Sequence, residues 1–182
     1  DFGAPAEAGF DGYLIKPVRQ RSLTARFAPE SEAAPAQPSQ RADIQAKVLG
    51  GQRILLAEDN PINALLAIKL IERMGGTPTW VTSGETALKE WRSAGAGAFA
   101  LGLFDIRMPG MSGLEAIATL RAEEQAAGHS PMPVAALTAN AFAEDRETCL
   151  AAGFTAFLSK PLEAEAFAFT IRTLAADRRS AA

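Results

Sequence analysis

Short apolar runs alternate with segments of helical periodicity from Arg53 to about residue 176, and this alternation limits the fold more than any other feature of the sequence. Strands are predicted where the apolar runs lie, at 54–57, 79–81, 101–104, 134–137 and 156–158. Helices are predicted at 61–74, 83–94, 113–125, 141–152 and 162–174. These β/α units, whose sheet needs cover on both faces, predict an α/β fold with a doubly wound, five-stranded parallel sheet. In such a sheet, chemistry is expected at the carboxyl ends of the strands.

The first helix and the third strand show the pattern in most detail. Asn60 and Pro61 supply an N-cap and a first-turn proline, and the Gly75-Gly76 pair ends the helix. Its apolar residues, expected to form one buried stripe, are Ile62, Leu65, Leu66, Ile68, Leu70, Ile71 and Met74. The third strand contains Gly102, and a glycine inside a strand predicts weak pairing.

Charge and composition argue against several classes of protein. The chain has 182 residues, 48% of them hydrophobic, and a net charge of −3, so it can bury a core but lacks the basic field that binds nucleic acid. It has neither a signal-like N-terminus nor an apolar run of membrane-spanning length. We therefore expect a cytoplasmic domain that makes no membrane contact, although its parent protein could be membrane-anchored. The single cysteine, Cys149, lies in a predicted helix and is expected to be a buried, inert thiol.

The first 52 residues contain a repeat and a linker. Residues 8–17, AGFDGYLIKP, are similar to residues 152–161, AGFTAFLSKP, at a constant offset. The N-terminus is therefore expected to hold the last strand and helix of an upstream copy, a fragment too small to fold alone. The following stretch is rich in Ala, Pro, Ser and Gln, as linkers are. The expected division is 1–27 upstream fragment, 28–52 linker, 53–176 complete domain and 177–182 tail.

Polar side chains follow four of the predicted strands. Glu58 and Asp59 come directly after the first strand, and Asp105 follows the third. Thr138 follows the fourth strand and Lys160 the fifth. Because the carboxyl ends of parallel strands meet at one edge of a sheet, these side chains are expected to converge. Carboxylates gathered there suit Mg²⁺, which keeps several waters and needs few carboxylates, so Asp59 and Asp105 are the expected ligands with Glu58 assisting.

This set of groups suits phosphoryl transfer. A carboxylate beside Mg²⁺ can attack phosphorus, while a hydroxyl and an ammonium nearby can hold the phosphoryl oxygens. Thr138 and Lys160 would supply those two groups. The reaction needs mainly positioning and charge neutralisation, both of which these residues offer.

The segments around these residues resemble the signature segments of two-component receiver domains. The similar segments are ILLAEDN, LFDIRMPGMSG, ALTAN and FLSKP, in that order and at familiar spacings. The resemblance covers residues 53 to about 174 and implies the flavodoxin-like receiver fold and a place in a phosphorelay. Two receivers in tandem with no output domain resemble the tail of a hybrid sensor histidine kinase, which is the expected parent protein.

The resemblance also implies a role for each residue of the site. Asp105 becomes the phosphoacceptor, and Glu58, Asp59 and the backbone carbonyl of Arg107 join it around Mg²⁺. The remaining implied roles are Thr138 as the switch hydroxyl, Lys160 as the phosphate-binding lysine, Phe157 as the rotating aromatic, and Pro161 as the residue after a cis peptide bond.

Each of these residues has an ordinary explanation when it is taken alone. An acidic pair after a strand suits a helix N-terminus, and Asp105 could form a turn before the Met-Pro-Gly that follows. Thr138 and Lys160 could be surface residues, and Phe157 could as readily be a core aromatic. Their common order after the strands favours the phosphoacceptor site over these separate explanations.

Three classes of function remain open. The first is a phosphoacceptor that draws its phosphoryl group from phosphohistidine on a histidine kinase domain, in the same polypeptide or another, or on a histidine phosphotransfer protein. His129, the one histidine, lies in a predicted loop, and no kinase catalytic domain is recognised. The second is a pseudo-receiver that only mediates protein interaction. The third is an aspartate-nucleophile phosphatase, although Arg107 stands where that class has a second aspartate. A homodimer through the last two helices is a further expectation, and nucleic acid is not expected as a partner.

Overall fold

One five-stranded parallel sheet forms the frame of the domain. The structure, a computed structural model, describes residues 48–139 and 143–180, with the backbone alone at 143–146 and 177–180. The strands are β1 (Arg53–Ala57), β2 (Thr77–Val81), β3 (Leu101–Asp105), β4 (Val134–Thr138) and β5 (Ala156–Ser159). All neighbouring strands pair in parallel, in the order β2-β1-β3-β4-β5. This arrangement confirms the predicted α/β fold.

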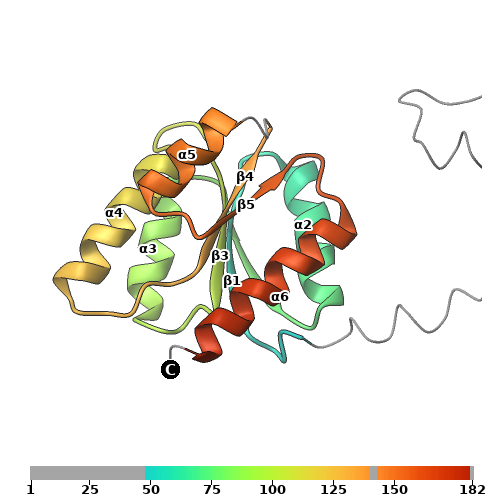
Figure 1. Cartoon of the computed structure of the whole chain (residues 1–182), viewed down its shortest axis with the longest axis horizontal. Coiled ribbons are helices and arrows are strands. Elements are labelled where there is room, and N and C mark those ends of the chain that lie inside the picture. The colour runs from blue at the N-terminus through green and yellow to red at the C-terminus, as the bar shows by residue number, and fades with distance from the viewer. Residues whose placement is uncertain (1–47, 140–142, 181–182) are drawn as a thin grey trace, which may run out of the picture. The chain divides into compact units, whose positions relative to one another are not determined.

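Helices cover both faces of the sheet. They are α2 (Pro61–Arg73), α3 (Gly84–Ala94), α4 (Gly113–Ala126), α5 (Ala143–Ala152) and α6 (Ala164–Ser180). Helices α2 and α6 pack on one face, and α3, α4 and α5 pack on the other (Figure 1). Among the helices in the described part of the chain, none is both long enough and apolar enough to cross a bilayer.

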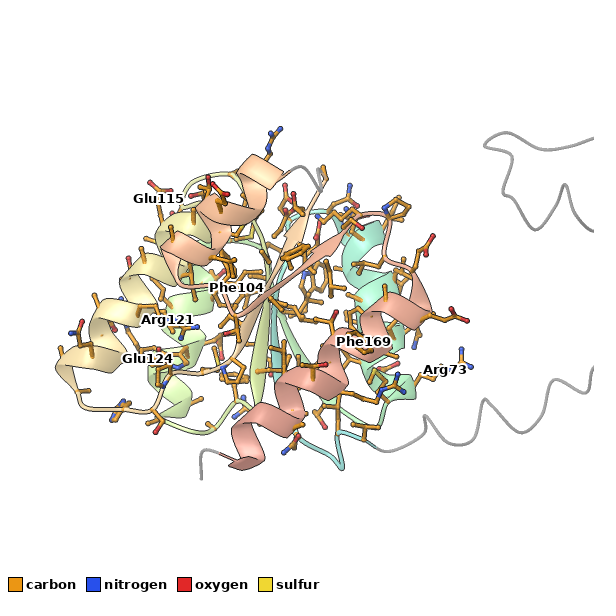
Figure 2. All side chains as sticks on the ribbon, in the orientation of Figure 1. Arg73, Phe104, Glu115, Arg121, Glu124 and Phe169 are labelled. Atoms are coloured by element: carbon orange, nitrogen blue, oxygen red, sulfur yellow. The ribbon has the colours of Figure 1, made fainter. Side chains whose placement is uncertain are left out.

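The inner strands are buried because both faces are covered. In β1, Ile54 and Leu56 join the core under α2 and α6, while Leu55 and Ala57 join the core under α3, α4 and α5. Strands β3 and β4 are buried at every position. Figure 2 shows Phe104 of β3 near the middle of the domain, and its side chain belongs to the second of these cores.

Strand β3 is firmly paired despite its glycine. It pairs with β1 on one side and with β4 on the other. A Cβ on Gly102 would lie 3.1 Å from the Phe104 ring and 3.2 Å from the Val134 side chain. The predicted weakness of this strand is therefore not observed, because the missing side chain leaves room for two large neighbours.

Helix α2 buries only part of the apolar stripe that the sequence predicts: Ile71 is buried, and Ile68 and Leu70 pack partly against the core. Its fully buried residues are Ala64, Ala67 and Ile71. The side chains of Ile62, Leu65 and Leu66 are 77%, 57% and 42% exposed, so the prediction that they form part of a buried stripe was wrong. A helix buries only one stripe against a sheet, and the two alanines let this helix approach closely. The larger residues of its first two turns are left on the surface.

Strand β2 lies at an edge of the sheet and carries a proline. The N–H of Thr77 donates to Gln52, and the carbonyl of Val81 accepts from Glu58, so alternate backbone groups of β2 face β1. Pro78 falls between them, at a position whose backbone nitrogen faces the free edge. The missing N–H therefore costs the sheet no hydrogen bond.

The packed domain begins before Arg53. Leu49, which the sequence places in the linker, is 1% exposed and belongs to the core under α2 and α6. Its N–H donates to the carbonyl of Met74 at 3.1 Å, and its side chain fills the space beside Gly76. The chain from Leu49 onward is thus part of the fold rather than linker. Residues 1–47, which hold the predicted upstream fragment and most of the predicted linker, lie outside the described residues.

The last helix is longer than predicted. Helix α6 continues past Leu174 to Ser180, so most of the predicted tail is helical. Neither glycine nor proline follows Leu174 in the sequence, and nothing local ends the helix there.

A partly buried charge pair fixes the end of α5 that lies away from the polar edge of the sheet. On α4, Nη1 of Arg121 lies 2.6 Å from Oε2 of Glu124 (Figure 2). Nε of Arg121 donates to the carbonyl of Gly153 at 2.9 Å, and Oε1 of Glu124 accepts from the N–H of Met132 at 2.7 Å. The pair therefore ties α4 to the residues after α5 and to those before β4.

The burial of Leu49 predicts a stability effect at a position that the sequence assigns to a linker. Leu49→Ala removes a fully buried side chain and leaves a cavity, so the free energy of unfolding should fall by about 2–5 kcal/mol. Urea denaturation followed by circular dichroism measures the change. Leu150→Ala is the matched control, because Leu150 is 48% exposed and its loss should change little. Equal stability of Leu49→Ala and the parent would place the residue outside the fold.

Candidate functional site

The carboxyl ends of four strands bring the predicted polar residues to one edge of the sheet. Glu58 and Asp59 follow β1, and Asp105 is the last residue of β3. Thr138 is the last residue of β4, and Lys160 follows β5. Because β1, β3, β4 and β5 are consecutive in the sheet, the predicted convergence occurs.

Lys160 binds two acidic residues of this group at once. Its Nζ lies 2.6 Å from Oδ2 of Asp105 and 2.6 Å from Oε2 of Glu58. Burial lowers the pKa of Lys160, but its contacts with Asp105 and Glu58 raise the pKa by more in sum, so it lies above the usual value. The side chain is therefore charged at neutral pH. It neutralises part of an acidic cluster that is itself almost fully buried at Glu58 and Asp105.

The acidic cluster has the composition of a site for a hard cation. One carboxylate oxygen from each of Glu58, Asp59 and Asp105 lies within 4.8 Å of the other two. Oε2 of Glu58 is buried and lacks a hydrogen bond in the described structure, although the Lys160 ammonium is close. An all-oxygen donor set of this kind fits Mg²⁺, because this ion prefers carboxylates and keeps several waters.

Two residues that the sequence did not single out hold Glu58 in place. Nδ2 of Asn63 donates to Oε1 of Glu58 at 3.1 Å, and Nε1 of Trp80 donates to the Glu58 carbonyl at 2.8 Å. Asn63 could have been found from its sequence position, because it lies in the first turn of the helix that follows Glu58. Trp80 could not, since nothing local links the end of β2 to the end of β1.

The remaining oxygen of Asp105 is bound by its own loop. The N–H of Arg107 donates to Oδ1 of Asp105 at 3.1 Å, while Oδ2 is the atom that faces Lys160. Arg107 carries the carbonyl that is predicted to bind the metal, and the N–H of the same residue holds the carboxylate of Asp105. The side chain of Arg107 is exposed.

Thr138 and Phe157 lie on neighbouring strands. Thr138 is buried, and its carbonyl accepts from the N–H of Lys160 at 2.7 Å. Phe157 is partly buried against the core under α3, α4 and α5. The Lys160-Pro161 peptide bond is cis, which confirms the expectation for that bond. Cys149 is buried, as predicted.

Known proteins are similar in sequence to this part of the chain. The family model described as the response regulator receiver domain matches residues 54–172. The sensor protein GacS of Pseudomonas syringae pv. syringae is 37% identical over 123 residues, which cover 67% of this chain and 13% of GacS. The chain therefore spans only a small part of this curated relative.

Two solved structures are also similar. The structure of full-length ShkA in complex with AMPPNP is 44% identical with a TM-score of 0.60, and the match covers 93% of this chain and 33% of that chain. The receiver domain of the sensor histidine kinase PA1611 from Pseudomonas aeruginosa PAO1 was solved with a magnesium ion in its active site cleft. It is 38% identical with a TM-score of 0.56, and the match covers 69% of this chain and 95% of that domain.

The position of Lys160 between two carboxylates predicts a large effect of its removal. Lys160→Met leaves Glu58 and Asp105 close together without their counterion, so the free energy of unfolding at pH 7 without divalent cations should fall by about 1–3 kcal/mol. Urea denaturation in the presence of a chelator measures it. Lys69→Met is the matched control, because Lys69 pairs with Glu72 on the surface and such pairs contribute little. A loss no larger than that of the control would contradict the counterion role.

Proposed function

Because this chain belongs to the response regulator receiver domain family, we propose that it accepts a phosphoryl group from phosphohistidine on the carboxylate of Asp105. The observation that carries the proposal is the contact of the Lys160 ammonium with Oδ2 of Asp105 at 2.6 Å, beside an acidic cluster that fits Mg²⁺. The carboxylate of Asp105 therefore lies between the Lys160 ammonium and the proposed Mg²⁺ site.

The proposed transfer uses the carboxylate of Asp105 as the nucleophile. One of its oxygens forms a bond to phosphorus, the bond between phosphorus and the imidazole nitrogen breaks, and the nitrogen keeps the electron pair. Lys160 and the hydroxyl of Thr138 bind the phosphoryl oxygens. This assignment agrees with the general need of phosphoryl transfer for positioning and charge neutralisation.

We assign the metal site to Glu58, Asp59, Asp105 and the backbone carbonyl of Arg107. Mg²⁺ bound there would neutralise negative charge on the phosphoryl oxygens. The magnesium-containing PA1611 receiver domain, at 38% identity, supports this cofactor. Asn63 and Trp80 act on the site indirectly, by fixing the side chain and the backbone of Glu58.

A surface beside the site is suited to the phosphodonor. Ile62, Leu65 and Leu66 project from the first two turns of α2, directly after the acidic pair in the sequence. Exposed apolar residues gathered at one place are typical of protein interfaces. We propose that a histidine kinase domain or a histidine phosphotransfer protein docks there with its phosphohistidine towards Asp105.

The proposal extends to the parent protein. We propose a hybrid sensor histidine kinase as the parent, with residues 1–27 as the end of an upstream receiver copy. The similarity to the sensor protein GacS supports a sensor protein as the parent. A cytoplasmic location of the domain is part of this proposal. A pseudo-receiver and an aspartate-nucleophile phosphatase remain less favoured. The former would need none of these charged groups to converge, and the latter lacks its second acid because Arg107 occupies that position.

We propose that Thr138 reports the phosphoryl group to the surface formed by α5, β5 and α6. Its hydroxyl would reach the added oxygens through movement of the segment after β4, and Phe157 would turn into the space vacated. The bond of Arg121 to Gly153 fixes the far end of α5, so the movement would occur at the end near Thr138. A homodimer through α5 and α6 is one readout of such a change.

The assignment of roles predicts different defects for Asp105 and Asp59. Asp105→Asn removes the nucleophile, so incubation with a small phosphodonor and Mg²⁺ should add no phosphoryl mass. Asp59→Ala keeps the nucleophile and should require a higher Mg²⁺ concentration for the same rate. Intact-mass spectrometry over a Mg²⁺ series measures both. Glu72→Gln, on the surface of α2, is the control and should match the parent. Phosphoryl gain by Asp105→Asn at the parent's rate would refute the assignment.

The switch predicts a change on one surface of the domain. Binding of beryllofluoride, a phosphoryl mimic, should alter hydrogen exchange of backbone amides in α5, β5 and α6 of the parent. The change should be lost in Thr138→Ala and kept in Thr119→Ala, which removes an exposed hydroxyl from α4. Changes confined to the loops around Asp105, with Thr138→Ala equal to the parent, would leave a phosphoryl store without a switch.

A further inference from the structure

The loop between β3 and α4, residues 106–112, is closed tightly at its two ends. The N–H of Gly113 donates to the carbonyl of Ile106 at 3.0 Å. A Cβ on Gly113 would collide with the carbonyl oxygen of Asp105, so only glycine lets the end of the loop return to its beginning. The loop carries Arg107, the residue whose carbonyl we assign to the metal.

The first turn of α3 holds the middle of this loop. The N–H of Met111 donates to Oε1 of Glu85 at 2.7 Å, and the carbonyl of Met111 accepts from the N–H of Gly84 at 3.2 Å. Both backbone groups of Met111 are therefore bound by the start of α3. A Cβ on Gly84 would lie 2.7 Å from the Met111 carbonyl oxygen, and one on Gly110 would lie 2.8 Å from Oε1 of Glu85. The close approach of the two backbones therefore requires a glycine at position 84, whereas Gly110 is required by its positive φ of 76°.

Ser83 and Thr86 cap the start of α3. Oγ of Ser83 accepts from the N–H of Thr86 at 3.3 Å, and Oγ1 of Thr86 accepts from the N–H of Ser83 at 3.2 Å. This capping box pairs the side chains and backbone amides of Ser83 and Thr86 with each other. Hydrogen bonds from its own backbone, Ser83 and Met111 lower the pKa of Glu85, so its carboxylate is charged at neutral pH. A charged acceptor makes the stronger hydrogen bond to a backbone N–H.

We propose that Glu85 is a positioning residue of the metal site: by holding Met111, it fixes the loop from Ile106 to Ser112 and so keeps the carbonyl of Arg107 available to Mg²⁺. Glu85 contributes no ligand and lies on a helix outside the cluster of Glu58, Asp59 and Asp105. The inference rests on the proposed function and adds to it a residue that acts through the loop. Its loss should weaken Mg²⁺ binding without removing the nucleophile or the Lys160 cation.

Calorimetric titration of the full chain with Mg²⁺ tests this role. Glu85→Ala removes the acceptor for Met111 and should raise the dissociation constant about tenfold, the lower end of the losses seen when groups that support a metal ligand are removed. Glu85→Gln keeps an oxygen at the same place and should stay within about threefold of the parent, because only the charge assistance is lost. Glu90→Ala, later in the same helix, is the control and should bind as the parent does.

Two further measurements separate positioning from a simple loss of stability. The amide of Met111 should exchange faster with solvent in Glu85→Ala than in the parent, and the rate of phosphoryl gain at saturating Mg²⁺ should remain near the parent's. A parent-like dissociation constant in Glu85→Ala, or an equal loss in Glu85→Gln and Glu85→Ala, would overturn the role of Glu85. A parent chain that binds no Mg²⁺ would overturn the metal site of the proposed function together with it.

Discussion

The ammonium group of Lys160 holds the carboxylates of Glu58 and Asp105 together, and the rest of the site depends on this contact. Two nearly buried carboxylates side by side would repel each other, and the Lys160 ammonium between them offsets that repulsion. The two side chains can therefore stand as close together as the proposed cation site and nucleophile require. The parallel sheet makes the contact possible, because β5 delivers the lysine to the edge at which β1 and β3 end.

The fold and the core of the site could be predicted from sequence because each depends on short-range patterns. Apolar runs of strand length and helical periods fix the order of elements, and parallel pairing then brings Asp59, Asp105, Thr138 and Lys160 to one edge. The position of each of these residues after its own strand was enough to predict that they converge. The resemblance to receiver domains added the carbonyl of Arg107 and the cis bond before Pro161, of which the structure shows the second.

Most of the features that the sequence did not reveal depend on contacts between distant segments. Glu85 meets Met111, and Trp80 meets Glu58, across loops whose paths no local pattern sets. Leu49 was assigned to a linker because it ends a stretch rich in Ala, Pro, Ser and Gln, yet it fills a space beside Gly76. In α2 the apolar pattern is wider than the stripe that the sheet can cover, so periodicity alone could not decide that Leu65 would face outward.

Pro78 determines how this domain can meet other proteins along its exposed edge. An edge strand can recruit a foreign strand by exchanging backbone hydrogen bonds, which leads to filaments or to intermolecular sheets. In β2, Pro78 removes one of the backbone N–H groups that would face the free edge. The indole N–H of Trp80, in the same strand, is already bonded to the carbonyl of Glu58. Strand addition at β2 is therefore unfavourable, so on this side of the sheet we expect contacts with other proteins to be made by side chains, where charge and shape can select the partner.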